Sequence, residues 1–266
     1  MPNYKLTLCY DGTRYRGWQR QGNTPNTIQE KVESALSRIL NQPVETAASG
    51  RTDAGVHARA QVVSFRAKTD RAPEAILRDL RAALPTDIGA ISLEEAAPRF
   101  HARLNAKGKT YVYRIWNSDA PDVFERKYRV PEPRALDLDA MRKAAAHLCG
   151  EHDFTSFCSD KRMKKTPVRR IDAIDVERLG DEVRLIFTGN GFLWNMVRIL
   201  TGTLMEVGLG ESDAETMPAI LEARDRAAAG KTAPAQGLIL WEVFYSYAEI
   251  EKANVGEGLA PPGVPV

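Results

Sequence analysis

The residue types most capable of chemistry lie in one short segment, residues 49–58, which read SGRTDAGVHA. Its two glycines, five positions apart, allow tight turns and close approach of a ligand to the backbone. Arg51 and Asp53 stand two positions apart with almost no bulk around them. A carboxylate in such a setting can act as a nucleophile or a base. The segment alone leaves open a second interpretation, in which Asp53 caps a backbone group in an ordinary turn.

A second group of candidates consists of side chains that could bind zinc, namely His147, Cys149, His152 and Cys158. Their spacing, H-x-C-x2-H-x5-C, does not match the usual ligand spacings of zinc sites. We therefore expect no metal site. The chain has three cysteines and no C-x-x-C pair, which predicts no disulfide framework and a reducing compartment.

Basic residues supply the candidates for nucleic-acid binding. The net charge is only +2, so a basic surface must come from local clusters. Arg14 stands in one cluster, which mixes arginines with Tyr15 and Trp18. A denser cluster covers residues 161–170 and includes Lys164 and Lys165, which are candidate phosphate contacts. The alternative for that cluster is a solvated loop.

The beginning of the sequence and its longest apolar runs bear on location. The first residues, MPNYKLTLCYDG, have no apolar stretch of the kind that a signal peptide carries. No run approaches 18 consecutive apolar residues, so we expect no membrane span. Both observations favour a cytoplasmic protein.

The elements that must position these residues follow from periodicity. In the first half, alternation predicts strands near residues 4–10, 44–48, 61–65 and 88–93. Helical spacing predicts helices over 28–39, which opens with a Thr27–Glu30 capping box, and over 73–84. In the second half, the same patterns predict strands at 110–116, 171–179, 182–188 and 238–247, and helices at 138–148, 193–207 and 214–228.

Each half thus follows the order β-α-β-β-α-β, the second with an extra helix. This order predicts an α+β protein of two ferredoxin-like, RRM-like units that form an extended, mostly antiparallel sheet with a central RNA-binding cleft. We expect an N-terminal domain over 1–105 that carries the loop 49–58, a C-terminal domain over 106–248, and a disordered tail over 249–266. Trp116, Trp194 and Trp241 are expected in the core.

A resemblance to a known family adds to these expectations. GRTDAGVHA is very similar to the active-site motif of the tRNA pseudouridine synthase A (TruA) family. Further segments resemble other motifs of that family in the right order, over about residues 4 to 245. These segments are YDGTRYRGWQRQ, NTIQEKVESAL, FHARLNAKGKTYVYRI, GEHDFTSFC, GNGFLWNMVRIL and APAQGLILWEV.

The resemblance implies roles for four residues. Asp53 takes the place of the family's nucleophile, and Arg51 that of the residue which replaces the flipped-out base. Tyr111 corresponds to the residue that stacks on the uracil, and Arg198 to the basic partner of the catalytic aspartate. The implied activity is isomerisation of uridine to pseudouridine at positions 38, 39 and 40 in the anticodon arm of tRNA. It needs no cofactor, and the implied assembly is a homodimer.

Two other classes of function stay open at this point. One is a non-catalytic RNA-binding protein on the same fold. The other is an aspartate-based glycosidic hydrolase, but such enzymes usually pair two carboxylates, and Asp53 is the only acid in its segment. Whether Asp53 attacks the uracil ring or the anomeric carbon of the ribose is also open.

Overall fold

The computed structural model describes residues 1–160, 162 and 166–254 of the 266. They cluster into two compact units. Unit 1 comprises Met1–Ala106 together with Ala235–Val243, and unit 2 comprises Lys107–Pro234 together with the described residues from Phe244 on. The sequence-based division placed residues 238–247 with the second half. The sequence-based division and the observed units differ because the strand at Leu238–Phe244 pairs with a strand of the first half, with Ile239 opposite His57.

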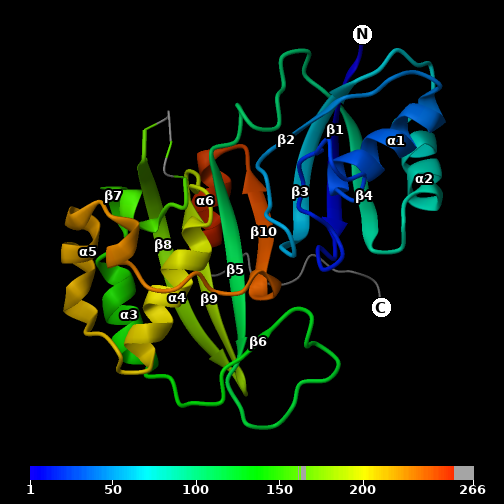
Figure 1. Ribbon diagram of the computed structural model, residues 1–266. Coiled ribbons are helices and arrows are strands. Elements are labelled where there is room, and N and C mark those ends of the chain that lie inside the picture. The colour runs from blue at the N-terminus through cyan, green and yellow to red at the C-terminus, as the bar shows by residue number, and fades with distance from the viewer. Residues whose placement is uncertain (161, 163–165, 255–266) are drawn as a thin grey trace. The chain divides into compact units, whose positions relative to one another are not determined.

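Unit 1 is built around a mostly antiparallel sheet (Figure 1). Its elements are β1 (Asn3–Tyr10), α1 (Ile28–Leu40), β2 (Thr46–Ala48), β3 (His57–Arg66), α2 (Pro73–Ala83), β4 (Ile88–Ala96) and β10 (Leu238–Phe244). The strand order is β4–β1–β3–β10, and the short β2 also pairs with β3. β10 is parallel to β3, whereas β1 is antiparallel to both β3 and β4.

Helix α1 forms where the capping box predicts it. The Thr27 side chain accepts a hydrogen bond from the Glu30 amide at 3.3 Å, which satisfies one of the free N–H groups at the helix start. The helix ends at Asn41, whose φ of 50° is left-handed. α2 begins at Pro73, as expected, and contacts both α1 and β4.

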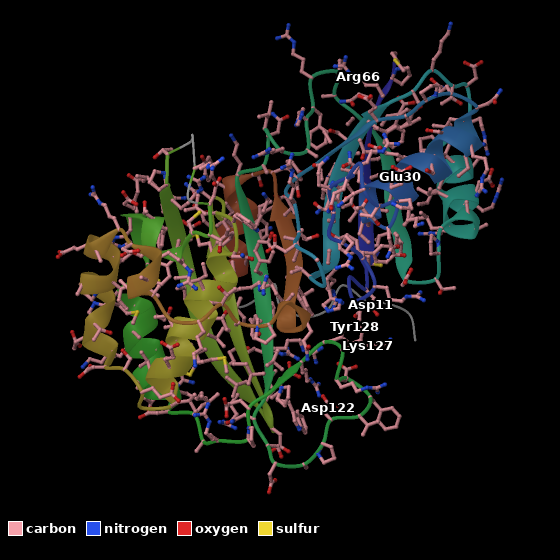
Figure 2. The ribbon with its side chains drawn as sticks, in the orientation of Figure 1. Asp11, Glu30, Arg66, Asp122, Lys127 and Tyr128 are labelled. Carbon is pink, nitrogen blue, oxygen red and sulfur yellow. The ribbon has the colours of Figure 1, made fainter. Side chains whose placement is uncertain are left out.

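Strand β1 fixes the geometry of the unit. Tyr4, Leu6 and Leu8 are fully buried and Tyr10 nearly so, because alternate side chains of this strand face the core. At its carboxyl end Tyr10 lies opposite Ala58 of β3. Figure 2 shows Asp11 at this end and Arg66 at the other. The loop 49–56 therefore enters β3 where β1 finishes.

The main strands of unit 2 pair antiparallel in the order β5–β9–β8–β7, and they belong to the same large, mostly antiparallel ten-stranded sheet that sequence pattern predicted. The elements of unit 2 are β5 (Gly108–Trp116), β6 (Val130–Pro131), α3 (Leu138–Ala146), β7 (Gly150–Asp153), η1 (Thr155–Phe157), β8 (Val168–Leu179), β9 (Glu182–Gly189), α4 (Met196–Gly208), η2 (Ala214–Thr216), α5 (Met217–Ala223), η3 (Arg226–Ala228) and α6 (Tyr247–Asn254). The short turn η4 (Ala235–Gly237), which precedes β10, belongs to unit 1. β6 adds to β5 as a short parallel strand.

Two helices of unit 2 differ from the sequence-based expectation. α4 begins at Met196 instead of residue 193, because Asn195 adopts a left-handed φ of 59°. The helix expected over 214–228 is divided into η2, α5 and η3. Arg224, with a φ of 47°, ends α5, and the Asp225 side chain then accepts from the Ala227 amide to begin a new turn.

The prediction of a disordered tail from residue 249 is wrong for residues 249–254, which belong to α6. A capping box that the sequence analysis overlooked explains the helix. Ser246 Oγ accepts from the Glu249 amide at 3.3 Å, and Glu249 Oε2 accepts from the Ser246 amide at 3.0 Å. Ile250 is buried against unit 2, within van der Waals reach of Gly108. The remaining tail, residues 255–266, lies outside the described residues.

Candidate active site

The loop 49–56 is anchored at its beginning by two fully buried polar residues, Ser49 and Gln61. The Ser49 amide donates to the Val62 carbonyl at 2.8 Å, and its Oγ donates to Gln61 Oε1 at 2.7 Å. Gln61 Nε2 in turn donates to the Gly50 carbonyl at 2.9 Å. Each of these buried groups is satisfied, so the start of the loop has one well-defined conformation.

Tyr10 extends this network to the residue before Asp53. Its hydroxyl lies 2.9 Å from Thr52 Oγ1 and 3.4 Å from Gln61 Nε2. Burial raises the pKa of Tyr10 to about 12, against a smaller opposing effect of these two hydrogen bonds. The hydroxyl is therefore protonated at neutral pH, and it can accept from Gln61 while it donates to Thr52. We call Tyr10, Ser49, Thr52 and Gln61 the loop anchor.

Two glycines of the segment after β1 allow that segment to pack on the loop. Gly17 has a φ of 91°, and a Cβ there would lie 2.8 Å from the Thr52 carbonyl oxygen. A Cβ on Gly12 would lie only 2.0 Å from the Val56 carbonyl oxygen. Any larger residue at either position would displace the loop that carries Asp53.

Asp53 itself lies in a turn between two buried neighbours. Its carbonyl accepts from the Val56 amide at 3.1 Å, and Gly55 completes the turn with a φ of 79°. Thr52 and Val56 are buried, Asp53 is partly exposed and Arg51 is exposed. A rigid frame thus presents both charged side chains at its surface, where a large substrate can reach them.

His57 and Arg14 take part in the frame around the loop. The Gly12 amide donates to Nδ1 of the buried His57 at 3.0 Å, so this histidine connects the loop to the segment after β1. Arg14 Nη2 lies 2.5 Å from Asp87 Oδ2, and the Tyr15 hydroxyl donates to the same carboxylate. The Arg14 side chain is nevertheless 73% exposed, so it can still meet an anion.

Unit 2 carries the other two residues to which the resemblance gives a catalytic role. Tyr111 lies on β5 opposite Phe187 of β9, with 8% of its surface exposed. Its ring meets Phe192 edge to face, with centroids 5.3 Å apart. Two positions along the strand, the Tyr113 hydroxyl donates to the Pro234 carbonyl at 2.8 Å.

Arg198 lies in the first turn of α4. Its Nε donates to the Ala233 carbonyl at 2.7 Å, and its Nη1 donates to Asn195 Oδ1 at 2.9 Å. The Asn195 side chain also donates to Ser159 Oγ at 3.0 Å. The guanidinium is therefore oriented from two sides, and its planar fork of five donors suits recognition of a carboxylate.

The expectation that Trp194 belongs to the core is wrong, because 57% of its surface is exposed. Trp194 lies in the turn before α4, next to Asn195 with its left-handed φ of 59°. Trp116 and Trp241 are partly exposed. The guanidinium of Arg59 lies 4.6 Å from the centre of the Trp241 ring, within unit 1.

The four zinc candidates have other partners. His152 Nε2 lies 2.8 Å from the Cys149 carbonyl oxygen, and His147 Nε2 lies 3.4 Å from Glu215 Oε2. Among residues 1–160, 162 and 166–254, no three His, Cys, Asp or Glu side chains gather as a metal ion would require. Within the same ranges, no helix is long and apolar enough to cross a membrane. Lys164 and Lys165 lie outside the described residues.

Two residues of the loop anchor, Tyr10 and Gln61, were not among the residues that the sequence predicted for the site. Periodicity placed both on predicted strands, but alternation does not distinguish a buried hydroxyl or amide with a partner from any other core side chain. Asn195 was missed for a similar reason. The available signal was an asparagine directly before a predicted helix and three residues before Arg198. Asparagine is common where φ is positive, so a turn at this position could have been expected.

The chain is similar in sequence to known proteins over most of its length. The family model of tRNA pseudouridine synthases matches residues 8–105 and 144–246. The tRNA pseudouridine synthase A 2 of Bacillus cereus (strain ZK / E33L) is 46% identical over 245 residues, which cover 92% of this chain and 100% of that protein. The tRNA pseudouridine synthase A of Bacillus sp. (strain KSM-64) is 46% identical over 240 residues, 90% of this chain and 98% of that protein. A solved structure, the archaeal box H/ACA sRNP Nop10-Cbf5 complex, aligns with 76% of this chain and 43% of its own at 14% identity. Its TM-score of 0.34 is too low to support an argument.

Proposed function

Because the chain belongs to the tRNA pseudouridine synthase family, we propose that it isomerises uridine to pseudouridine at positions 38, 39 and 40 in the anticodon arm of tRNA. The observation that supports the proposal best is the loop anchor. Buried hydrogen bonds hold the residues on the N-terminal side of Asp53 in one conformation, while Asp53 and Arg51 reach the surface. Such preorganisation is what a nucleophile acting on a large substrate requires.

Asp53 is the proposed nucleophile. Pseudouridine formation breaks the N-glycosidic bond, rotates the uracil and forms a carbon–carbon bond, so that product and substrate contain the same atoms. The reaction therefore needs no cofactor. The carboxylate attacks either a carbon of the uracil ring or the anomeric carbon of the ribose, and either route forms a covalent intermediate that is released in a later step.

The other three residues have supporting roles in this proposal. Arg198 supplies a permanent positive charge that keeps a desolvated carboxylate ionised. Tyr111 stacks on the uracil, and Arg51 takes the space that the flipped base leaves. Removing a base from its stack costs a few kcal/mol, and stacking on an aromatic side chain returns about 1–3 kcal/mol.

We further propose that each unit is ferredoxin-like. In unit 1 the element order β1-α1-β2-β3-α2-β4 supports this, together with pairing of β1 between β3 and β4 and of β2 with β3. Helices α1 and α2 pack against each other and lie on the same side of the unit 1 sheet (Figure 1). The opposite face of such a sheet is the one that RRM-type domains use to bind RNA.

We propose that local basic residues supply the electrostatic part of the affinity for tRNA. Arg14, exposed beside the loop frame, contacts a phosphate, and Lys164 and Lys165 act in the same way from the basic segment 161–170. We also propose a homodimer, which the resemblance implies.

The deciding experiment is mass mapping of pseudouridine in tRNA that has been incubated with the purified protein. The expected product is pseudouridine at positions 38–40. Free uracil would identify a glycosidic hydrolase, and unchanged tRNA that remains bound would identify a non-catalytic RNA-binding protein. An Asp53→Asn preparation serves as the control for contaminating activity.

A further inference from the structure

The turn before α4 presents an aromatic side chain that the proposed reaction does not use. Trp194 is 57% exposed, whereas Met196 and Val197, which follow it, are buried. Tryptophan is enriched among the residues that contribute most to binding at interfaces. Trp194 is therefore a candidate ligand-binding side chain.

The backbone around Trp194 is held in place on both sides. The Ser159 amide donates to the Trp194 carbonyl at 3.1 Å, and the Met196 amide donates to the Leu193 carbonyl at 3.1 Å. The Asn195 side chain donates to Ser159 Oγ. A ligand that meets the indole would therefore pay little for ordering the turn, which is a condition for tight binding.

The turn is also connected to the proposed active site. Asn195, the next residue, accepts from Nη1 of Arg198 at 2.9 Å. Phe192, two residues before Trp194, meets the Tyr111 ring edge to face. Trp194 is thus four residues before Arg198 and two residues after Phe192, which contacts Tyr111.

The surroundings of the indole favour an anionic partner. Among the described residues of the segment 159–170, Arg162, Arg169 and Arg170 are basic and Asp160 is the only acid. Arg169 lies close to the turn, because a Cβ on Gly191 would be 3.9 Å from its Cδ and Nε. Arg170 is exposed. Aromatic rings beside a basic segment are the combination that single-stranded nucleic acids bind, the bases on the ring and the phosphates on the cations.

We propose that Trp194 is a stacking platform for an unpaired nucleobase of the tRNA, one that neighbours the target uridine. The inference rests on the proposed function, because that function supplies a substrate with an anticodon loop. Paired bases have both faces covered by their neighbours, so only an unpaired base offers a face to the indole. Stacking is tolerant of sequence, which suits an enzyme that acts at several positions.

The test uses the full chain and intact tRNA. Trp194→Leu is expected to raise the Kd for tRNA about 5- to 100-fold, whereas Trp194→Phe, which keeps a ring, retains most of the affinity. In steady-state kinetics, Trp194→Leu is expected to raise KM much more than it lowers kcat. Tyr247→Leu is the matched control, since it removes another exposed aromatic ring of unit 2, and it should leave Kd unchanged.

A coupling measurement identifies the base. tRNAs that carry one abasic nucleotide at a time in the anticodon loop are bound to the wild type and to Trp194→Leu. At the stacked position, the wild type loses affinity while Trp194→Leu loses nothing further. Equal losses in both proteins at every position would overturn the proposal. The proposal would also be overturned if Trp194→Leu changed the sedimentation coefficient of the protein but left the tRNA affinity per protomer unchanged. In that case the indole would pack against a second copy of the chain. Wild-type protein that forms no pseudouridine but shows the coupling would refute the proposed function and leave the platform standing.

Discussion

Asp53 is the only acid among residues 49–58, and Thr52 and Val56 on either side of its turn are buried. Substitution of the carboxylate by an amide of the same shape preserves the turn, because the Val56 amide bonds to the main chain of Asp53. The effect of the substitution on turnover therefore reports on chemistry and not on folding.

We predict that Asp53→Asn lowers pseudouridine formation at least 1000-fold, on the order expected for loss of a nucleophile. The Kd for tRNA should change less than about threefold. Single-turnover assays and equilibrium binding measure the two quantities. Activity within tenfold of the wild type would show that another residue attacks the substrate.

Tyr111 permits a separation of its ring from its hydroxyl. Tyr111→Phe keeps the edge-to-face contact with Phe192 and should preserve binding, so any loss of turnover reports the hydroxyl, which could assist proton removal from uracil C5. Tyr111→Ala removes the ring and should lower kcat/KM about 5- to 100-fold because the uracil no longer stacks. A fully active Tyr111→Ala protein would rule out the stacking role.

At the scale of elements, the loop anchor connects β1 and β3 to the residue that precedes Asp53. Tyr10→Phe removes one hydroxyl and leaves Thr52 Oγ1 and one donor of Gln61 without that partner in a buried site. We predict a loss of about 1–3 kcal/mol in the free energy of unfolding. We also predict a lower kcat with little change in KM. The substrate should still bind, but the Asp53 carboxylate would no longer be held in the position that the reaction requires.

The matched control for Tyr10→Phe is Tyr4→Phe, a change on the same face of β1 at the end of the strand away from the loop. Chemical denaturation and steady-state kinetics at a temperature well below both melting points separate positioning from stability. If Tyr4→Phe and Tyr10→Phe lower kcat equally, the loop anchor has no special role in positioning Asp53.

A second element-scale feature is the ion cluster at the start of β9. Glu182 is buried, and its two oxygens lie 2.8 Å from Nε and Nη2 of Arg114 and close to Arg129 and Arg184. Burial raises the pKa of Glu182, but the hydrogen bonds and charges of Arg114 and Arg184 outweigh burial and lower the pKa from 4.5 to about 2.

A depressed carboxylate pKa stabilises the folded state at pH values above the unfolded-state pKa, and this contribution is lost as the pH falls through the folded-state pKa. We therefore predict that Glu182→Gln lowers the free energy of unfolding by about 3 kcal/mol at pH 7. The difference from the wild type should shrink steadily between pH 4.5 and pH 2. Urea titrations of both proteins at about pH 7 and about pH 3 would measure the difference in their free energies of unfolding. The same difference at both pH values would contradict the lowered pKa of Glu182.

Local pattern in the sequence predicted part of this molecule. The capping box correctly predicted the start of α1. Residue type and spacing indicated the segment 49–58, but the roles of Arg51 and Asp53 come from the family resemblance and stay predictions. The part that Tyr10 plays in the loop anchor could not be predicted in this way, because its hydrogen bonds join residues 42 and 51 positions apart. The expectation for Trp194 was wrong for a different reason: the apolar character of tryptophan favours burial, but this residue lies in the turn before α4 with 57% of its surface exposed.

At the scale of the whole molecule, a net charge of +2 means that long-range attraction to tRNA is weak, so local clusters must carry the salt dependence of binding. We predict that charge reversal of Lys164 and Lys165 together lowers the slope of log K against log salt by about 0.7–0.9 for each phosphate that is no longer neutralised. Lys68→Glu with Lys252→Glu makes the same change in net charge at two exposed lysines elsewhere.

Arg51→Ala is expected to behave differently from the double lysine variant. A side chain that replaces a flipped base releases few counterions, so the salt slope should stay while the single-turnover rate falls. If Arg51→Ala alters only the slope, Arg51 binds a phosphate. If the double lysine variant and its control have the same slope, the segment 161–170 is a solvated loop.

The return of β10 to β3 has a consequence for biosynthesis. Ile239 pairs with His57, so the strand that leaves the loop gains this neighbour only after about 180 further residues have been translated. At roughly 5–20 residues per second, the edge of β3 at His57 and Ala58 stays open for about 10 to 40 seconds on each ribosome. An open strand edge can pair with another nascent chain. Until β10 emerges, this edge of β3 is therefore available for pairing with the same edge of a neighbouring nascent chain.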